Sequence, residues 1–278
     1  MLLLSGNRAD EATITVERDW QAPITNLQSR FLRRVARSSG LALDQCRFRV
    51  RLPQRRAIRG VVLVNHNLTI RARYRMRAYR AGDERYDSGW IDVYRRVKSW
   101  REMRWGDPNF WSGRPTEEDL AGFTRTLVRT LLETIDADEW LIEIDDRENP
   151  AGFIEIGRLF IAGGSQPAHN YSYGAELGQE TATRVDRSRT GVKYFDRREP
   201  TRVMRLTLQD LPEQEVFERW LEVQRRMGLD GEVFIIPDPS DELNMTRRSF
   251  LGTLRTLPPS VQSNFRRGTI ALEIEESL

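Results

Sequence analysis

Four large aromatic residues stand close together near the middle of the chain, in a stretch that also contains glycine, proline and arginine. They are Trp100, Trp105, Phe110 and Trp111. Exposed tryptophan rings can stack on sugar rings, because both present a flat apolar surface beside polar groups. Four such side chains in one long loop can equally form a small satellite core or an interface. The loop is therefore a candidate contact site for a glycan or for another subunit.

A second candidate site is a run of arginines at every other position. Its members are Arg71, Arg73, Arg75 and Arg77. Side chains two residues apart on a strand share one face, so the four guanidinium groups would form a row that could bind phosphates or an anionic sugar. The chain also has many acidic residues to neutralise them. A solvated or subunit-facing sheet surface is therefore the alternative to anion binding.

Residues suited to catalysis or metal binding are scarce. The chain has two histidines, His66 and His169, and one cysteine, Cys46. It contains no nucleophile elbow, phosphate loop or dinucleotide fingerprint. The neighbouring acids Asp145 and Asp146 would point to opposite faces of a strand, which is a poor arrangement for glycoside hydrolysis. We therefore expect no catalytic residue, no metal and no cofactor. Cys46 is expected to be a small, buried residue that packs like an apolar side chain.

Composition gives the broad class of protein. The 278 residues suffice for one large or two ordinary domains. The 44 basic and 41 acidic residues leave a net charge of only +3, which does not suit a dedicated or sequence-specific nucleic-acid binder. No apolar run approaches the roughly 18 residues of a membrane helix, and the apolar start is too short for a signal peptide. The expectation is a soluble protein made and kept in a cytoplasm, without membrane insertion.

The first half of the chain reads as β-strands. Between Ile70 and Tyr79 apolar residues alternate strictly with the arginines, which is typical of a strand in the outer sheet of a sandwich. Thr116 begins a capping pattern for a short helix. The stretch 124–135 has helical spacing but four threonines, and we favour a strand. Further strands are expected at 47–51, 61–64, 140–144 and 153–161.

A glycine- and proline-containing stretch, 162–167, is the best candidate domain boundary. Beyond it, a hairpin is expected over 185–195 and a strand over 201–209. One helix follows, with Asp210 as its cap, Gly228 as its end and a core-facing stripe. The stripe contains Phe217, Trp220 and Leu221. Three more strands are expected at 232–236, 248–256 and 269–275, so this half is an α+β barrel or sheet braced by one helix.

Two parts of the sequence resemble known families. The first half resembles discoidin-like, galactose-binding-like sandwiches. The segments that carry this resemblance are 26–27, 35–40, 58–68, 74–79, 86–90 and 152–160. The second half resembles the ring-forming domain of distal tail proteins from phages and prophages with long tails. The segments that carry it are 170–174, 211–227 and 270–276.

The two resemblances together imply a mainly β chain. Residues 1–165 would form a discoidin-like jelly-roll β-sandwich, and residues 166–278 a tail-tube-like α+β barrel with one packed helix. The implied function is a structural subunit of a phage tail tip or baseplate, which we expect to form a six-fold ring that joins the tail tube to the hub and fibres. Its partners would be further copies of itself, the tube, hub, tape-measure and fibre proteins, and a host surface glycan.

The implied location is the virion, with assembly in the cytoplasm of the bacterial host. An alternative function is a carbohydrate- or receptor-binding tail module for host adhesion. A wall or polysaccharide hydrolase is a third hypothesis, and the scarcity of catalytic residues speaks against it.

Overall fold

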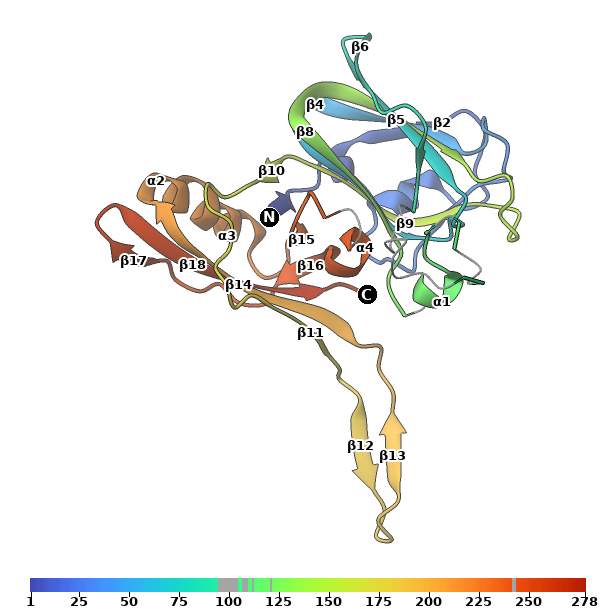
Figure 1. Ribbon diagram of the computed structural model, residues 1–278. Helices are drawn as coiled ribbons and strands as arrows, with labels where there is room; N and C mark the ends of the chain where they lie inside the picture. The colour runs from blue at the N-terminus through green and yellow to red at the C-terminus, as the bar shows by residue number, and fades with distance from the viewer. Residues whose placement is uncertain (95–104, 107–109, 112, 121, 242–243) are drawn as a thin grey trace. The chain divides into compact units, whose positions relative to one another are not determined.

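The computed structural model describes residues 1–94, 105–106, 110–111, 113–120, 122–241 and 244–278. The chain is mainly β and divides into two compact units (Figure 1). Unit 1 consists of Met1, Gln166–Ile235 and Phe250–Leu278, and unit 2 consists of Leu2–Ser165 and Ile236–Ser249. The segment Ile236–Ser249, which the sequence places in the C-terminal domain, therefore belongs with the N-terminal strands.

Unit 2 is built around two long antiparallel strands, β4 (Arg47–His66) and β8 (Thr126–Asp145). Their pairing shifts register after Arg51 and again after Ile58, and such irregularities bend a strand. The first half of β4 pairs with β2, and its second half pairs with β9. The second half of β8 pairs with β5. Both halves of the bent pair thus carry further strands.

The remaining elements of unit 2 are short. The strands are β1 (Leu2–Ser5), β2 (Thr13–Val16), β3 (Ala36–Arg37), β5 (Arg73–Arg80), β6 (Asp83–Asp87), β7 (Ile91–Asp92), β9 (Glu155–Ala162) and β10 (Gly164–Ser165). The helices are α1 (Glu117–Leu120) and α4 (Met245–Arg248), with 3-10 turns at Arg8–Glu11 and Ile24–Gln28. The hydroxyl of Thr116 accepts from the Asp119 amide at 3.2 Å, so the predicted cap of α1 is confirmed.

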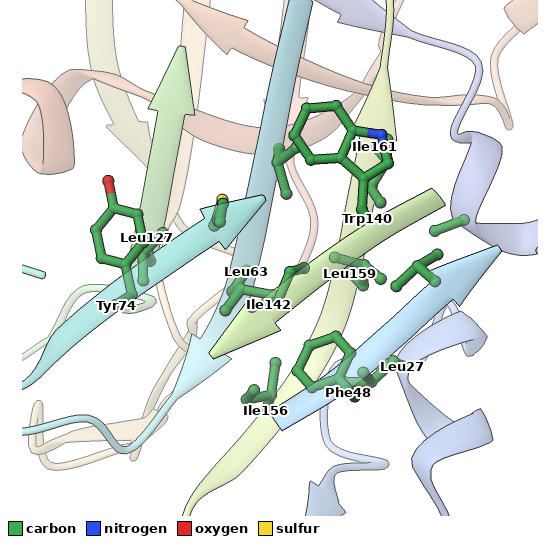
Figure 2. Packing of buried hydrophobic residues seen from close by; sticks show 14 of the residues in the cluster. Leu27, Phe48, Leu63, Tyr74, Leu127, Trp140, Ile142, Ile156, Leu159 and Ile161 are labelled. Carbon is green, nitrogen blue, oxygen red and sulfur yellow. The ribbon is translucent and has the colours of Figure 1, made fainter. Parts of the chain in front are cut away.

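One apolar core joins both halves of the bent strands (Figure 2). Phe48 comes from the first half of β4 and Leu63 from the second, while Trp140 lies on β8 and Ile161 on β9. The residues Tyr74, Met76 and Ala78 of β5 are buried in this core, as is Ala72 directly before the strand. The predicted alternation of β5 is confirmed, as is the strand assignment of 124–135, which lies mostly within β8. A sandwich is therefore the fold of unit 2.

Unit 1 contains an open antiparallel sheet with the order β15-β16-β18-β14-β11, and β17 also pairs with β18. Its strands are β11 (Glu176–Glu180), β14 (Thr201–Pro212), β15 (Glu232–Ile236), β16 (Phe250–Leu254), β17 (Val261–Asn264) and β18 (Arg267–Glu276). The predicted closed barrel is not observed among the described residues. Strand β11 is a terminal strand of this sheet, and the chain continues from it into a separate hairpin.

The helical segment of unit 1 runs through α2 (Glu213–Glu215), a π-helical stretch η3 (Val216–Leu221) and α3 (Glu222–Met227). Gly228 ends it with a φ of 56°, as predicted. Asp210, however, is not its cap: this residue lies in β14 at a register shift, also with a positive φ. Pro212 occupies the N-cap position without a side-chain hydrogen bond.

The helix stripe is only partly as predicted. Trp220 is fully buried and donates from its indole Nε1 to Glu215 Oε1 at 3.1 Å. Phe217 is 56% exposed, so its predicted place in the core is wrong, while Leu221 is half-buried. The buried apolar positions of the helix are Val216, Trp220 and Val223, at i, i+4 and i+7 spacing, and Phe217 lies outside this stripe.

Candidate functional site

The predicted aromatic site forms an exposed cluster of three rings in unit 2. Trp105 and Trp111 are 83% and 81% exposed, and Phe110 is half-buried. The ring centroids lie 5.3 Å apart for Trp105 and Phe110, 5.2 Å for Phe110 and Trp111, and 6.0 Å for the two tryptophans. Trp100, the fourth predicted member, lies outside the described residues.

The three rings meet edge to face, with interplanar angles between 63° and 88°. This geometry is favourable for aromatic pairs, because the positive edge of one ring meets the negative face of another. Each tryptophan keeps most of its surface in solvent. The cluster can therefore stack on a sugar ring or pack against an apolar partner, and the geometry alone favours neither.

The predicted arginine row is neutralised by acidic residues of unit 2. Arg71 pairs with Glu148 at 2.6 Å, Arg73 with Asp145 at 2.9 Å, and Arg77 with Glu143 at 2.9 Å. Arg75 donates from Nε to Asp87 at 2.9 Å. Each of the four guanidinium groups thus already has a carboxylate partner. The row has no spare charge for a polyanion, and the alternative of a solvated or subunit-facing surface fits it better.

The Arg75–Asp87 pair also changes the acidity of the carboxyl group. The hydrogen bond from Arg75, together with the Gly89 amide, lowers the pKa of Asp87 from 3.8 to about 2. Asp87 lies on β6, which pairs with β5 at Arg77. The row is therefore held by strands that flank it on both sides, since Asp145 and Glu143 come from β8.

The residues screened for catalysis have structural environments. Burial lowers the pKa of His66 from 6.5 to about 3, and its Nδ1 accepts from the Leu68 amide at 3.2 Å. Burial raises the pKa of the Cys46 thiol to about 11, so its predicted buried position is confirmed. Asp146 accepts from the Thr69 amide at 3.0 Å. Within the described ranges, His, Cys, Asp and Glu form no group of three or more that could hold a metal.

The most unusual surface feature lies in unit 1, in the residues between β11 and β14. Strands β12 (Arg184–Arg187) and β13 (Lys193–Asp196) pair only with each other and form the predicted hairpin (Figure 1). All eight of their residues are exposed, including Val185, Tyr194 and Phe195. We call residues 181–200 the arm.

Threonine hydroxyls organise the base of the arm. The Thr183 hydroxyl accepts from the Arg198 amide at 3.0 Å and lies 2.8 Å from the Thr181 hydroxyl. The Thr181 hydroxyl also accepts from the Thr183 amide at 3.1 Å. These bonds join the two segments at the base of the arm, where β11 and β14 no longer pair. The arm is thus an ordered extension of the sheet and not an unstructured loop.

Comparisons with known proteins return carbohydrate-binding modules and lectins among solved structures. One is the family 32 carbohydrate-binding module of Clostridium perfringens NanJ in complex with galactose, at 17% identity, covering 57% of this chain and 98% of that one, with a TM-score of 0.36. Another is the family 32 module of Streptococcus pneumoniae EndoD, at 14% identity, covering 57% and 99%, with a TM-score of 0.36. A third is the fucolectin from striped bass (Morone saxatilis) serum, at 10% identity, covering 99% of both chains, with a TM-score of 0.36.

TM-scores of this size do not establish a common fold. No family model matches the chain, and no curated protein matches it. The description of unit 2 as a sandwich therefore rests on its own strand pairing. Among the described helices, each is too short or too polar to cross a membrane.

Sequence reasoning located the hairpin but missed its exposure. The signal was present, because Val185, Tyr194 and Phe195 stand among charged residues on both sides of the turn and do not form one apolar face. It also missed a buried ion pair in unit 1. Arg202 donates from Nε to Glu276 at 2.8 Å, and both side chains are 5% exposed.

Proposed function

We propose that this chain is a non-catalytic structural subunit of a phage tail tip, which assembles with further copies of itself through unit 1. The observation that carries the proposal is the arm. A two-stranded hairpin is marginally stable by itself in water. Exposed apolar side chains on such an element are characteristic of surfaces that are covered by a partner.

The order of elements in unit 1 supports the same proposal. An open sheet, one bracing helix and a projecting hairpin match the strand–helix–strand arrangement that carries the resemblance to distal tail proteins. In this proposal unit 1 forms a closed ring, most simply of six copies. The tube, hub, tape-measure and fibre proteins are its neighbours in the virion.

The test is the mass and shape of the purified full-length chain. Light scattering over a range of concentrations is expected to give one discrete multimer, and negative-stain images are expected to show closed rings. Intact tails labelled with an antibody against the chain should carry the label at the tip. A chain that stays monomeric at every concentration, and is absent from tails, would refute the proposal.

A second candidate function is contact with a surface glycan, favoured by the exposed rings of Trp105, Phe110 and Trp111. Stacking a sugar on such rings contributes without requiring a deep pocket. A glycan array with the full-length chain tests it. Binding that is lost in the Trp105→Ala, Trp111→Ala variant, and kept in a Phe31→Ala control, would support this function. Absence of binding to every glycan would refute it.

A further inference from the structure

The arm presents a defined apolar pair. In the hairpin register, Val185 lies directly opposite Phe195, and directly paired residues have their side chains on the same face. The two are 49% and 60% exposed. Tyr194, opposite Asp186, lies on the other face. The Val185–Phe195 face is thus a small apolar surface at the middle of the hairpin, and no described strand or helix covers it.

A second exposed apolar surface lies at the helix of unit 1. Phe217 on η3 and Val261 on β17 line a groove of about 30 Å³, and Val216 and Gly268 also line it. Phe217 is 56% and Val261 59% exposed. We call this feature the helix groove.

The arm and the helix groove lie at opposite ends of one strand. β14 begins at Thr201, directly after the arm, and ends at Pro212, directly before the helix. At 3.3 Å per residue its eleven steps separate the two ends by roughly 36 Å. The pairing of β11 with β14 ends at Glu180 and Thr201, and the arm begins beyond this point. The arm therefore extends away from the helix groove of its own copy. An arm can therefore reach a helix groove only on another copy.

Charge also favours contact between copies. The arm has six basic and three acidic residues, a net charge of +3. The rest of unit 1 has eight basic and twelve acidic residues, a net charge of −4. No ion pair is present within the described residues for Arg184, Arg187, Arg189 or Lys193 of the arm. Opposite net charges steer such surfaces together and suppress arm-to-arm contact.

We propose that the arm of one copy packs its Val185–Phe195 face on the helix groove of the next copy, with Phe195 against Phe217 and Val261. This inference rests on the proposed function, because it specifies how the multimer is joined. The contact is heterologous: each copy uses two different surfaces. Repetition of such a contact gives a ring where the rotation closes.

Cysteine cross-linking tests the contact in the full-length chain. Cys46 is buried, so engineered cysteines react without competition from it. The Phe195→Cys, Val261→Cys double variant is expected to form a ladder of disulfide-linked multimers under mild oxidation. Each single variant should give no species beyond a dimer. The matched control is Tyr173→Cys with Val261→Cys, because Tyr173 is exposed but lies outside the arm.

A second pair of variants separates this inference from the proposed function. Phe195→Asp should weaken self-association at least tenfold by analytical ultracentrifugation, whereas Leu257→Asp, at another exposed apolar position, should leave it unchanged. A multimer that forms without the ladder and is insensitive to Phe195→Asp would overturn the arm-to-groove contact and leave the proposed function standing. A wild-type chain that never self-associates would overturn both.

Discussion

Two arginine-containing parts of this chain differ in what surrounds their charged side chains. The arginine row of unit 2 has a carboxylate partner for each guanidinium group, supplied by β6, β8 and the turn that follows β8. The arm of unit 1 has five arginines in its 20 residues, but its strands pair only with each other, so most of its cations meet water. The difference shows that the neighbouring residues, and not the charge of a strand itself, determine whether its cationic side chains are paired within the chain or are free to contact a partner.

The largest expected effect is a loss of stability of unit 1, which carries the arm. Trp220→Asp places a carboxylate where the structure has a fully buried indole, and should lower the free energy of unfolding of unit 1 by at least about 4 kcal/mol. Because a domain is stable by only roughly 5–15 kcal/mol, unit 1 should lose its cooperative transition in calorimetry.

Limited proteolysis of the same variant separates the two units. Cleavage should spread through residues 166–235, while the strands of Leu2–Ser165 remain protected. Trp220→Phe serves as the control, since it keeps an aromatic ring in the core. A Trp220→Asp variant that melts and assembles like the wild type would contradict the buried placement of the helix.

Elements of unit 2 could be predicted from sequence where their patterns are local. Alternation identified β5, and capping residues identified α1. The exposure of Phe217 could not be predicted, because two adjacent apolar residues, Val216 and Phe217, could each face the core, and only the packing of the helix decides between them. The open edge at β11 depends on which strands meet in space, and local periodicity does not report this.

For the candidate sites too, the sequence predicted the residues but not the partners that they contact. Residue types and spacing identified the aromatic cluster and the arginine row, but not the partners of the row, which come from β6, β8 and the turn that follows β8. Arg202 and Glu276 are 74 positions apart, so only the pairing of β14 with β18 brings them together.

The second expected effect compares a buried ion pair with an exposed one. Glu276→Ala leaves the buried Arg202 guanidinium without its carboxylate, and should destabilise unit 1 by roughly 3–5 kcal/mol. Glu148→Ala removes the exposed partner of Arg71 in unit 2 and should cost less than about 1 kcal/mol. Denaturant unfolding of both variants measures the contrast, and equal losses would contradict it.

The third prediction concerns pH and the arginine row. Asp87 has a pKa of about 2 in the folded chain against 3.8 in the unfolded one, so its contribution to stability is present above pH 3.8 and is lost as the pH falls toward 2. Arg75→Gln should return the Asp87 pKa toward 3.8, as measured by carboxyl NMR titration. The same titration of Arg71→Gln is the control, because Arg71 pairs with Glu148. An unchanged Asp87 pKa in Arg75→Gln would show that the pair does not form in solution.

The smallest expected effect on stability comes from substitutions in the arm, the region compared above with the arginine row. Val185→Asp and Phe195→Asp remove side chains that are exposed in the isolated chain, so the free energy of unfolding of the monomer should change by less than about 0.5 kcal/mol. Measured at a concentration where the multimer forms, the same substitutions should lower the melting temperature, because binding to the folded state stabilises it by mass action. A loss of stability already in the monomer would mean that the arm packs on its own chain, and the contrast with the arginine row would fail.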